Sequence, residues 1–340
     1  MVAIIFVIMY HASVESYGAM HLTYSQFTMY WWTSTIYESL VLPGVPLFVM
    51  LSGALLLQTS KTNEPIRVLL KKRLSRIGYA FAFWTAIYLT WTYFVDKTPV
   101  TIDFIVKAIT INGAYYHFWF LYLIAGLYLA TPVLRVLVAH ADLRILRYMI
   151  ILWFISVAVL PLIQLISGAG INGSVFVFGG YIGYFILGVY LMKVQLRSIF
   201  TYGLLLLSIV WTIAGTWLMA FPFHSAGQYY FYFYTLSANI VIASVAIFLI
   251  LSKFPANWPA NKSPRLGKVV HAISENTLPI YLLHVIILES LERGYFGFTL
   301  SLTIMNPVWE APLATAVTLF ICLGLVLLMK KVPVLKKLIG

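Results

Sequence analysis

His11 and Glu15 lie one helical turn apart in the apolar stretch MVAIIFVIMYHASVESYG, which opens the sequence. The i,i+4 spacing puts both side chains on one helix face, where a carboxylate can fix the tautomer and orientation of the imidazole ring. An ionisable residue inside a membrane segment is by default a functional-site hypothesis. We expect His11 to act as a general base, with Glu15 beside it. The alternative for Glu15 is a place in the outer headgroup region.

Two further histidines, His117 and His284, lie in apolar segments at a depth similar to that of His11. All three are expected in the outer half of the membrane, where they can converge on one cavity. The alternative for His117 and His284 is a hydrogen bond between helices, a common use of membrane histidines. A zinc site is not expected, because the HxH and HExxH spacings are absent from the sequence.

A basic segment, KTNEPIRVLLKKRLSRIGYAFAFW, places Arg73 and Arg76 three residues apart on one helical face, with Lys71 and Lys72 beside them. A guanidinium group donates two parallel hydrogen bonds to a phosphate, so an arginine pair suits a phosphorylated ligand. The alternative is ordinary positive charge that faces anionic lipid.

The composition indicates which structural elements must position these groups. The chain has 340 residues, of which 62% are hydrophobic and 9% charged, too few polar residues for a water-soluble globule of this size. A membrane-spanning helix needs roughly 20 apolar residues. We predict an all-α polytopic membrane bundle of about ten helices, near residues 1–18, 37–58, 77–95, 115–134, 148–166, 176–192, 199–221, 231–252, 269–289 and 308–329.

The basic residues predict the orientation of this bundle. With the N-terminus inside, all but Lys97, Lys107 and Arg293 of the 22 lysines and arginines fall in inside loops or the tail from 330, as cytoplasmic loops require. Both termini are therefore expected to be cytoplasmic. The net charge of +12 indicates anionic lipid headgroups as a surface partner and does not imply nucleic acid.

One cysteine, Cys322, excludes a disulfide framework and a thiolate metal cluster. The first apolar stretch lacks the basic region and the cleavage site of a signal peptide. We expect residues 1–340 to form a single integral membrane domain with no soluble domain and no permanently bound cofactor. The sequence does not predict the oligomeric state.

Five segments in this order resemble the acyltransferase 3 family of integral membrane acyltransferases, especially its bacterial surface-polysaccharide O-acetyltransferase branch. The similarity covers nearly the whole chain. The segments are YHA around His11, GVPLFVMLSGALLL at 44–57, the pair Arg73 and Arg76, HFWFLYLIAGLYLATPVLR at 117–135, and ENTLPIYLLH, which ends at His284. Trp119 and Tyr281 lie within these motifs and join His117 and His284 as candidates for lining a substrate cavity.

The resemblance implies a multi-pass enzyme of the bacterial plasma membrane. It implies transfer of an acyl group, acetyl by default, from cytoplasmic acyl-CoA to a hydroxyl of a glycan or lipid-linked sugar at the outer face. His11 would be the essential first-helix histidine, and Arg73 and Arg76, with Lys72 nearby, would hold the CoA phosphates. Aromatic residues of the first outer loop, Tyr30 to Tyr37, would offer faces for a sugar ring, or would mark the membrane interface.

The sequence departs from the family at one position. The family's first helix has an arginine followed by ten residues and then the histidine, which places that arginine just before Met1. We expect a first helix truncated at its N-terminus or a misassigned start; the other interpretation is an inactive family member. A transporter or flippase for a glycan precursor or metabolite is the alternative function, although the repeated halves of many transporters are not visible.

Overall fold

The computed structural model describes residues 1–14, 29–58, 60, 64–111, 113–168, 180–194, 196–220, 232, 234–255, 258–302 and 304–340. Within these ranges the chain is helical and contains no β-strand, which confirms the predicted all-α class.

Eighteen helical elements follow one another along the described residues. The first nine are α1 (Val2–Val14), α3 (Met29–Val41), α4 (Gly44–Leu56), α5 (Ile66–Phe94), α6 (Ile102–Thr110), the 3-10 turn η2 (Tyr116–Phe118), α7 (Trp119–His140), α8 (Leu143–Phe154) and the π-helical turn η3 (Ile155–Val159). The others are α9 (Leu160–Ser167), α10 (Ile182–Lys193), α11 (Ser198–Ala220), α12 (Ala238–Ser252), α13 (Trp258–Lys262), α14 (Pro264–Glu275), α15 (Thr277–Glu292), α16 (Pro307–Met329) and α17 (Pro333–Leu338).

Five helical stretches of the described chain are long and apolar enough to cross a membrane. They are Met29–Leu56, Tyr116–His140, Leu143–Ser167, Ser198–Ala220 and Pro307–Met329, and the bent pair α14 and α15 would add a sixth. The helices α1, α10 and α12 are apolar but have 13, 12 and 15 residues, fewer than the roughly 20 that span a bilayer. The count of ten spans and the side of the termini therefore stay predictions.

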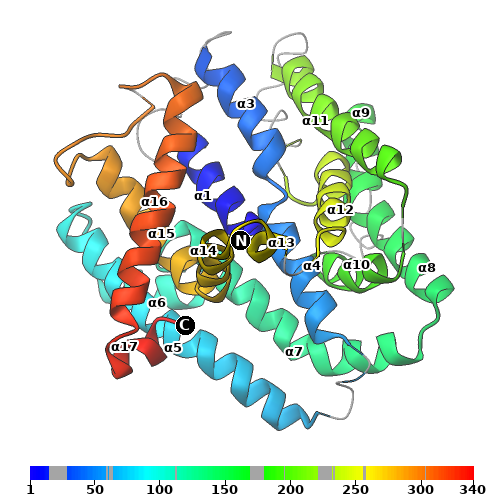
Figure 1. Cartoon of the computed structure of the whole chain (residues 1–340), viewed down its shortest axis with the longest axis horizontal. Helices are drawn as coiled ribbons and strands as arrows, with labels where there is room; N and C mark the ends of the chain where they lie inside the picture. Colours follow the sequence, from blue (N-terminus) through cyan, green and yellow to red (C-terminus); the bar gives the residue numbers. More distant parts are fainter. Residues whose placement is uncertain are drawn as a thin grey trace.

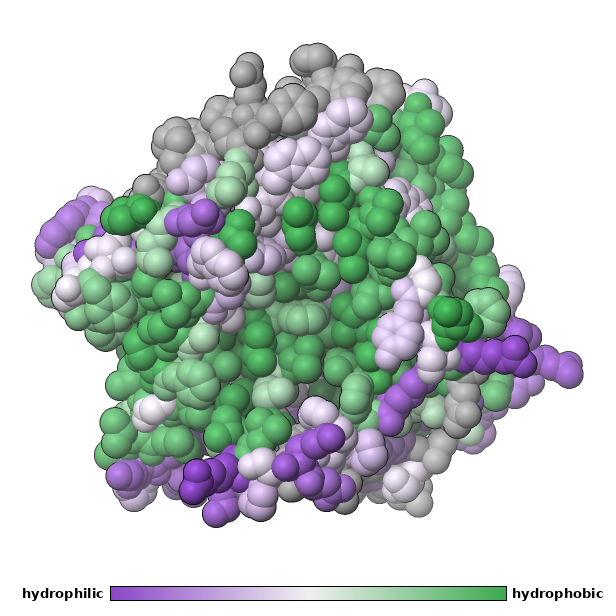
Figure 2. All heavy atoms as spheres, turned by 45° about the horizontal axis from the view of Figure 1, so that its top comes forward, coloured by the Kyte–Doolittle hydropathy of each residue, from purple (hydrophilic) through white to green (hydrophobic). Residues whose placement is uncertain are grey.

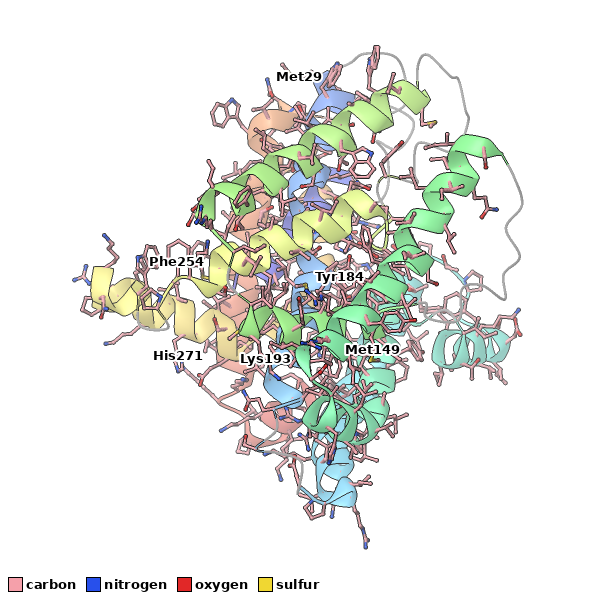
Figure 3. The ribbon with its side chains drawn as sticks, turned by 90° about the vertical axis from the view of Figure 1, so that its right-hand side faces the viewer. Met29, Met149, Tyr184, Lys193, Phe254 and His271 are labelled. Carbon is pink, nitrogen blue, oxygen red and sulfur yellow. The ribbon has the colours of Figure 1, made fainter. Side chains whose placement is uncertain are left out.

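The predicted span at 269–289 differs from the structure. The chain breaks at Asn276, and α14 and α15 meet at 83°. The segment before the break, PRLGKVVHAISE, carries basic side chains three residues apart at Arg265, Lys268 and His271, whereas the segment after it is mostly apolar. A helix with one basic face suits the membrane interface better than its interior. In Figure 3, α13 and α14, with His271 labelled, project sideways from the bundle.

The helix α1 lies inside the bundle, where it packs against α3, α4, α15 and α16 (Figure 1). Ile4 and Ile8 on α1 are fully buried by these neighbours. His11 follows Ile8 at a spacing of three residues, so it lies near the same face. The packing of α1 therefore directs His11 toward the middle of the protein.

Apolar side chains cover much of the outer surface. Figure 2 shows hydrophobic residues across the middle of one face, with hydrophilic residues gathered at its lower edge and side margins. Exposed apolar residues over so large an area are a hallmark of a lipid-facing surface. Lys72 and Arg76, on the first turns of α5, are exposed, and we call the end of the bundle that carries them the basic end.

Two glycines bring α4 and α10 into backbone contact. A Cβ atom on Gly53 would lie 1.8 Å from the Phe185 carbonyl oxygen, and one on Gly188 would lie 1.9 Å from the Met50 carbonyl oxygen. Small residues allow such close approach of membrane helices. The two contacts are reciprocal, so each helix depends on a missing side chain of the other.

We expect Gly53→Ala and Gly188→Ala each to destabilise the protein by about 1–3 kcal/mol or more, because the added methyl group collides with backbone that cannot rotate away. Gly126→Ala is the matched control, since a Cβ there meets no atom within 4 Å and alanine favours the helix by roughly 0.5–1 kcal/mol. Thermal unfolding in detergent measures both. Equal midpoints for Gly53→Ala and Gly126→Ala would contradict the close approach.

Candidate active site

Three histidines from distant parts of the chain meet inside the bundle. The ring centroids of His11 and His284 are 5.2 Å apart, and those of His117 and His284 are 5.4 Å apart. They come from α1, from the turn η2 that precedes α7, and from α15. The convergence that the sequence left open is therefore a feature of the structure, and the three rings form what we call the histidine cluster.

The three rings differ in burial. His117 and His284 are 1% and 0% exposed, whereas His11 is only half-buried. Beside His11, at 5.2 Å between ring centroids, lies Tyr116, which is 43% exposed. His11 is therefore the member of the cluster that a molecule from outside can reach most directly.

Hydrogen bonding defines the tautomer of His284. Its Nδ1 lies 2.5 Å from the Tyr281 carbonyl oxygen, three residues back on α15. A carbonyl oxygen only accepts, so Nδ1 carries the hydrogen and Nε2 keeps its lone pair. Nε2 is buried and has no hydrogen-bond partner among the described residues. A buried acceptor without a donor is unfavourable and is often found at functional sites.

Tyrosine hydroxyl groups hold the cluster in place. Tyr281 donates to the His117 carbonyl oxygen at 2.6 Å, which ties α15 to η2. Tyr88 on α5 donates to the Leu282 carbonyl oxygen at 2.8 Å, and its ring lies 5.0 Å from that of His117. The turn before η2 needs Gly113, which has φ +76° and leaves no room for a Cβ beside Phe118.

A buried carboxylate lies farther along α15. Glu289, 1% exposed, accepts hydrogen bonds from the Tyr115 hydroxyl at 2.5 Å and the Trp91 indole N–H at 2.8 Å. Arg293, paired with Asp96 at 2.6 Å, is 3.8 Å from the same carboxylate. These contacts fix the residue two positions before His117 to the helix that carries His284.

The basic end forms a second, separate group. The guanidinium carbon of Arg73 lies 6.0 Å from the centroid of the Tyr128 ring on α7. Burial lowers the pKa of Lys330, just past α16, and the positive charges of Arg76 and Lys336 lower that pKa further, while Glu275 opposes them. Cations from α5, α16 and α17 therefore lie near one another, an arrangement that favours a phosphate group.

The candidate site residues selected from the sequence lie in different parts of the structure. Tyr281 joins the histidine cluster, with its ring 5.6 Å from His117 and 5.5 Å from His284. Trp119 is 40% exposed and packs on Tyr181 at 5.7 Å, outside the ring contacts of the cluster.

The basic candidates Arg73, Arg76 and Lys72 lie at the basic end of α5, away from the histidines. Glu15 lies outside the described residues.

Several residues of the site were not identified from the sequence: Tyr88, Tyr115, Tyr116, Glu289 and Lys330. Glu289 had a signal, because a carboxylate five residues after His284 in an apolar helix is as unusual as the histidine itself. Among the described residues, no group of three His, Cys, Asp or Glu side chains is arranged to hold a metal ion.

An apolar helical bundle of this kind is typical of a multi-pass membrane protein, and the ionisable cluster in its interior is its candidate functional site. A family model described as an acyltransferase domain, acyltransferase 3, matches residues 1–327. The chain belongs to the acyltransferase 3 family of membrane acyltransferases, which confirms the resemblance and favours acyl transfer over transport. No curated protein and no solved structure matches the chain.

Glu289→Gln should lower the free energy of unfolding by about 1–3 kcal/mol. The carboxylate accepts from the Tyr115 hydroxyl and the Trp91 indole N–H, and the new amide N–H group would face one of these two donors. Glu275→Gln is the control: that carboxylate is 63% exposed and pairs with His271 on the surface, a contact worth about 0.5 kcal/mol. The midpoints of thermal unfolding in detergent are compared for Glu289→Gln and Glu275→Gln. Equal midpoints would show that Glu289 is not held as described.

Proposed function

We propose that the protein transfers an acyl group, acetyl in the simplest case, from cytoplasmic acyl-CoA to a hydroxyl of a cell-surface or exported glycan. The proposed site of action is the bacterial plasma membrane. The observation that carries the proposal is the histidine cluster, a partly exposed imidazole backed by two buried ones. Imidazoles are the commonest general bases in enzymes, and a family of acyltransferases supplies the reaction class.

The spacing of the two groups along α5 supports a CoA thioester as the donor. Arg73 and Tyr88 are fifteen residues apart on one helix, or roughly 22 Å at about 1.5 Å per residue. Tyr88 contacts His117. This length is comparable to an extended pantetheine arm, so phosphates held at Arg73 and Arg76 would put the thioester near the histidine cluster. Lys72 and Lys330 would add positive charge beside the phosphates.

In the proposed mechanism, His11 removes the proton from the acceptor hydroxyl as its oxygen attacks the thioester carbonyl carbon. The tetrahedral intermediate collapses, the carbon–sulfur bond breaks, and the CoA thiolate leaves and takes the proton from the His11 imidazolium. An acyl-His11 intermediate is the alternative route. The inner histidines, His117 and His284, would orient the substrate or stabilise the oxyanion. The exposed ring of Tyr116 offers a flat face to the sugar.

His11→Ala should lower the rate of acetyl transfer by roughly 10²–10⁴-fold, the usual contribution of a general base. His271→Ala is the control, since His271 is 73% exposed on α14, and it should leave the rate unchanged. Transfer of radiolabelled acetyl from acetyl-CoA to a glycan acceptor, by protein in lipid nanodiscs, measures both. The assay is run on the 340-residue chain and on the same chain with an arginine added before Met1. Equal rates for His11→Ala and the parent form would contradict the proposal.

The double variant Arg73→Ala/Arg76→Ala should weaken binding of acetyl-CoA by roughly tenfold or more per arginine. Each charge-assisted hydrogen bond contributes about 1.5–3 kcal/mol, and about 1.4 kcal/mol is tenfold. Arg144→Ala/Arg147→Ala, exposed on α8, is the control for lost positive charge. Equilibrium binding of acetyl-CoA to nanodisc-embedded protein measures the effect. A similar loss in both double variants would mean that the arginine pair has no specific role.

A further inference from the structure

Residues 333–340, which we call the 333–340 segment, fold back against α5 (Figure 1). Ile339 is fully buried, and its carbonyl oxygen accepts a hydrogen bond from the Trp84 indole N–H at 3.4 Å. Gly340 lies between two helices: a Cβ built on it would be 2.8 Å from Leu278 Cδ2 on α15 and 3.5 Å from Ala80 Cβ on α5. Ile339 and Gly340 therefore occupy a seat between α5 and α15.

This seat lies between the arginine pair and the histidine cluster. Arg73, Ala80, Trp84 and Tyr88 follow one another at spacings of seven, four and four residues, which keeps them on one face of α5. Trp84 contacts Ile339, and one turn later Tyr88 contacts His117. On α15, Leu278 contacts Gly340 and precedes Tyr281 by one turn.

The 333–340 segment is held in this seat by little buried surface. None of the residues of α17 is buried, and Val334 is 65% exposed. Ile339 supplies the buried anchor at 0% exposure. An element with little buried surface opens at a small free-energy cost relative to the core. The 333–340 segment can therefore leave its seat without unfolding of the bundle.

We propose that the face of α5 from Arg73 to Tyr88, beside α15, is the passage for the pantetheine arm of the acyl donor, and that the 333–340 segment covers this passage. The proposal rests on the proposed function, because only a donor with phosphates at the basic end and a thioester at the histidine cluster needs the passage. Binding of acyl-CoA displaces Ile339 and Gly340, and the apolar face of Trp84 then packs against the arm.

A disulfide between the segment and α5 tests the displacement. In a Cys322→Ala background, Ala80→Cys and Gly340→Cys would place the two Cβ atoms about 3.5 Å apart, within the range that disulfides adopt. The oxidised pair should bind acetyl-CoA at least tenfold more weakly than the same protein after reduction. Each of the two single-cysteine variants should bind acetyl-CoA with the same Kd before and after treatment with the oxidant. Unchanged binding by the cross-linked protein would overturn the proposal.

A substitution at the anchor tests the same equilibrium in the opposite direction. Ile339→Ala removes buried contacts of the closed form, so the open fraction rises and the apparent Kd for acetyl-CoA falls in proportion. We expect binding to tighten several-fold, with no change for Val334→Ala on the exposed side of α17. Weaker or equal binding of acetyl-CoA by Ile339→Ala would overturn the proposal that the 333–340 segment covers the passage. If neither the reduced protein nor its parent binds acetyl-CoA, the proposed function itself fails, and the passage with it.

Discussion

The hydrogen bond from the buried Tyr281 hydroxyl to the His117 carbonyl oxygen is the contact on which the candidate site depends. In an apolar interior, a hydroxyl or a carbonyl without a partner is strongly unfavourable, so these two groups fix α15 against the turn η2. Tyr281 also accepts the Nδ1 hydrogen of His284 through its own carbonyl oxygen. One residue therefore sets the distance between two histidines and the tautomer of one of them.

The same physical rule shapes the rest of the bundle. The buried charged side chains Glu289 and Arg135 find partners in the protein. Glu289 accepts from Tyr115 and Trp91, and Arg135 donates to Glu64 and to the Leu56 carbonyl oxygen. The candidate groups are separated along α5: the cations lie at its basic end, and the imidazoles lie near Tyr88, farther along the same helix. A donor that carries negative charge at one end and a reactive acyl group at the other fits this separation.

The sequence predicted the helical class and the family, because both depend on composition and on motifs that can be read residue by residue. It identified His11, His117 and His284, because an ionisable residue is conspicuous in an apolar helix. Glu289 carried the same kind of signal but was not identified. Its partners Tyr115 and Trp91 come from distant parts of the chain, so the sequence could not show that it joins the site. Ile339 had no signal, because its seat depends on how a distant segment folds back. The bend at Asn276 likewise depends on packing.

A double-mutant cycle between His11 and His284 tests most directly whether the histidine cluster acts as one site. The rate of acetyl transfer, as kcat/KM, is measured for the parent protein, His11→Ala, His284→Ala and the double variant. Residues that act as a unit are strongly non-additive, so we predict that the double variant loses little more than His11→Ala alone. If instead the two losses multiply, the histidines contribute independently, and the account of a single catalytic cluster is wrong.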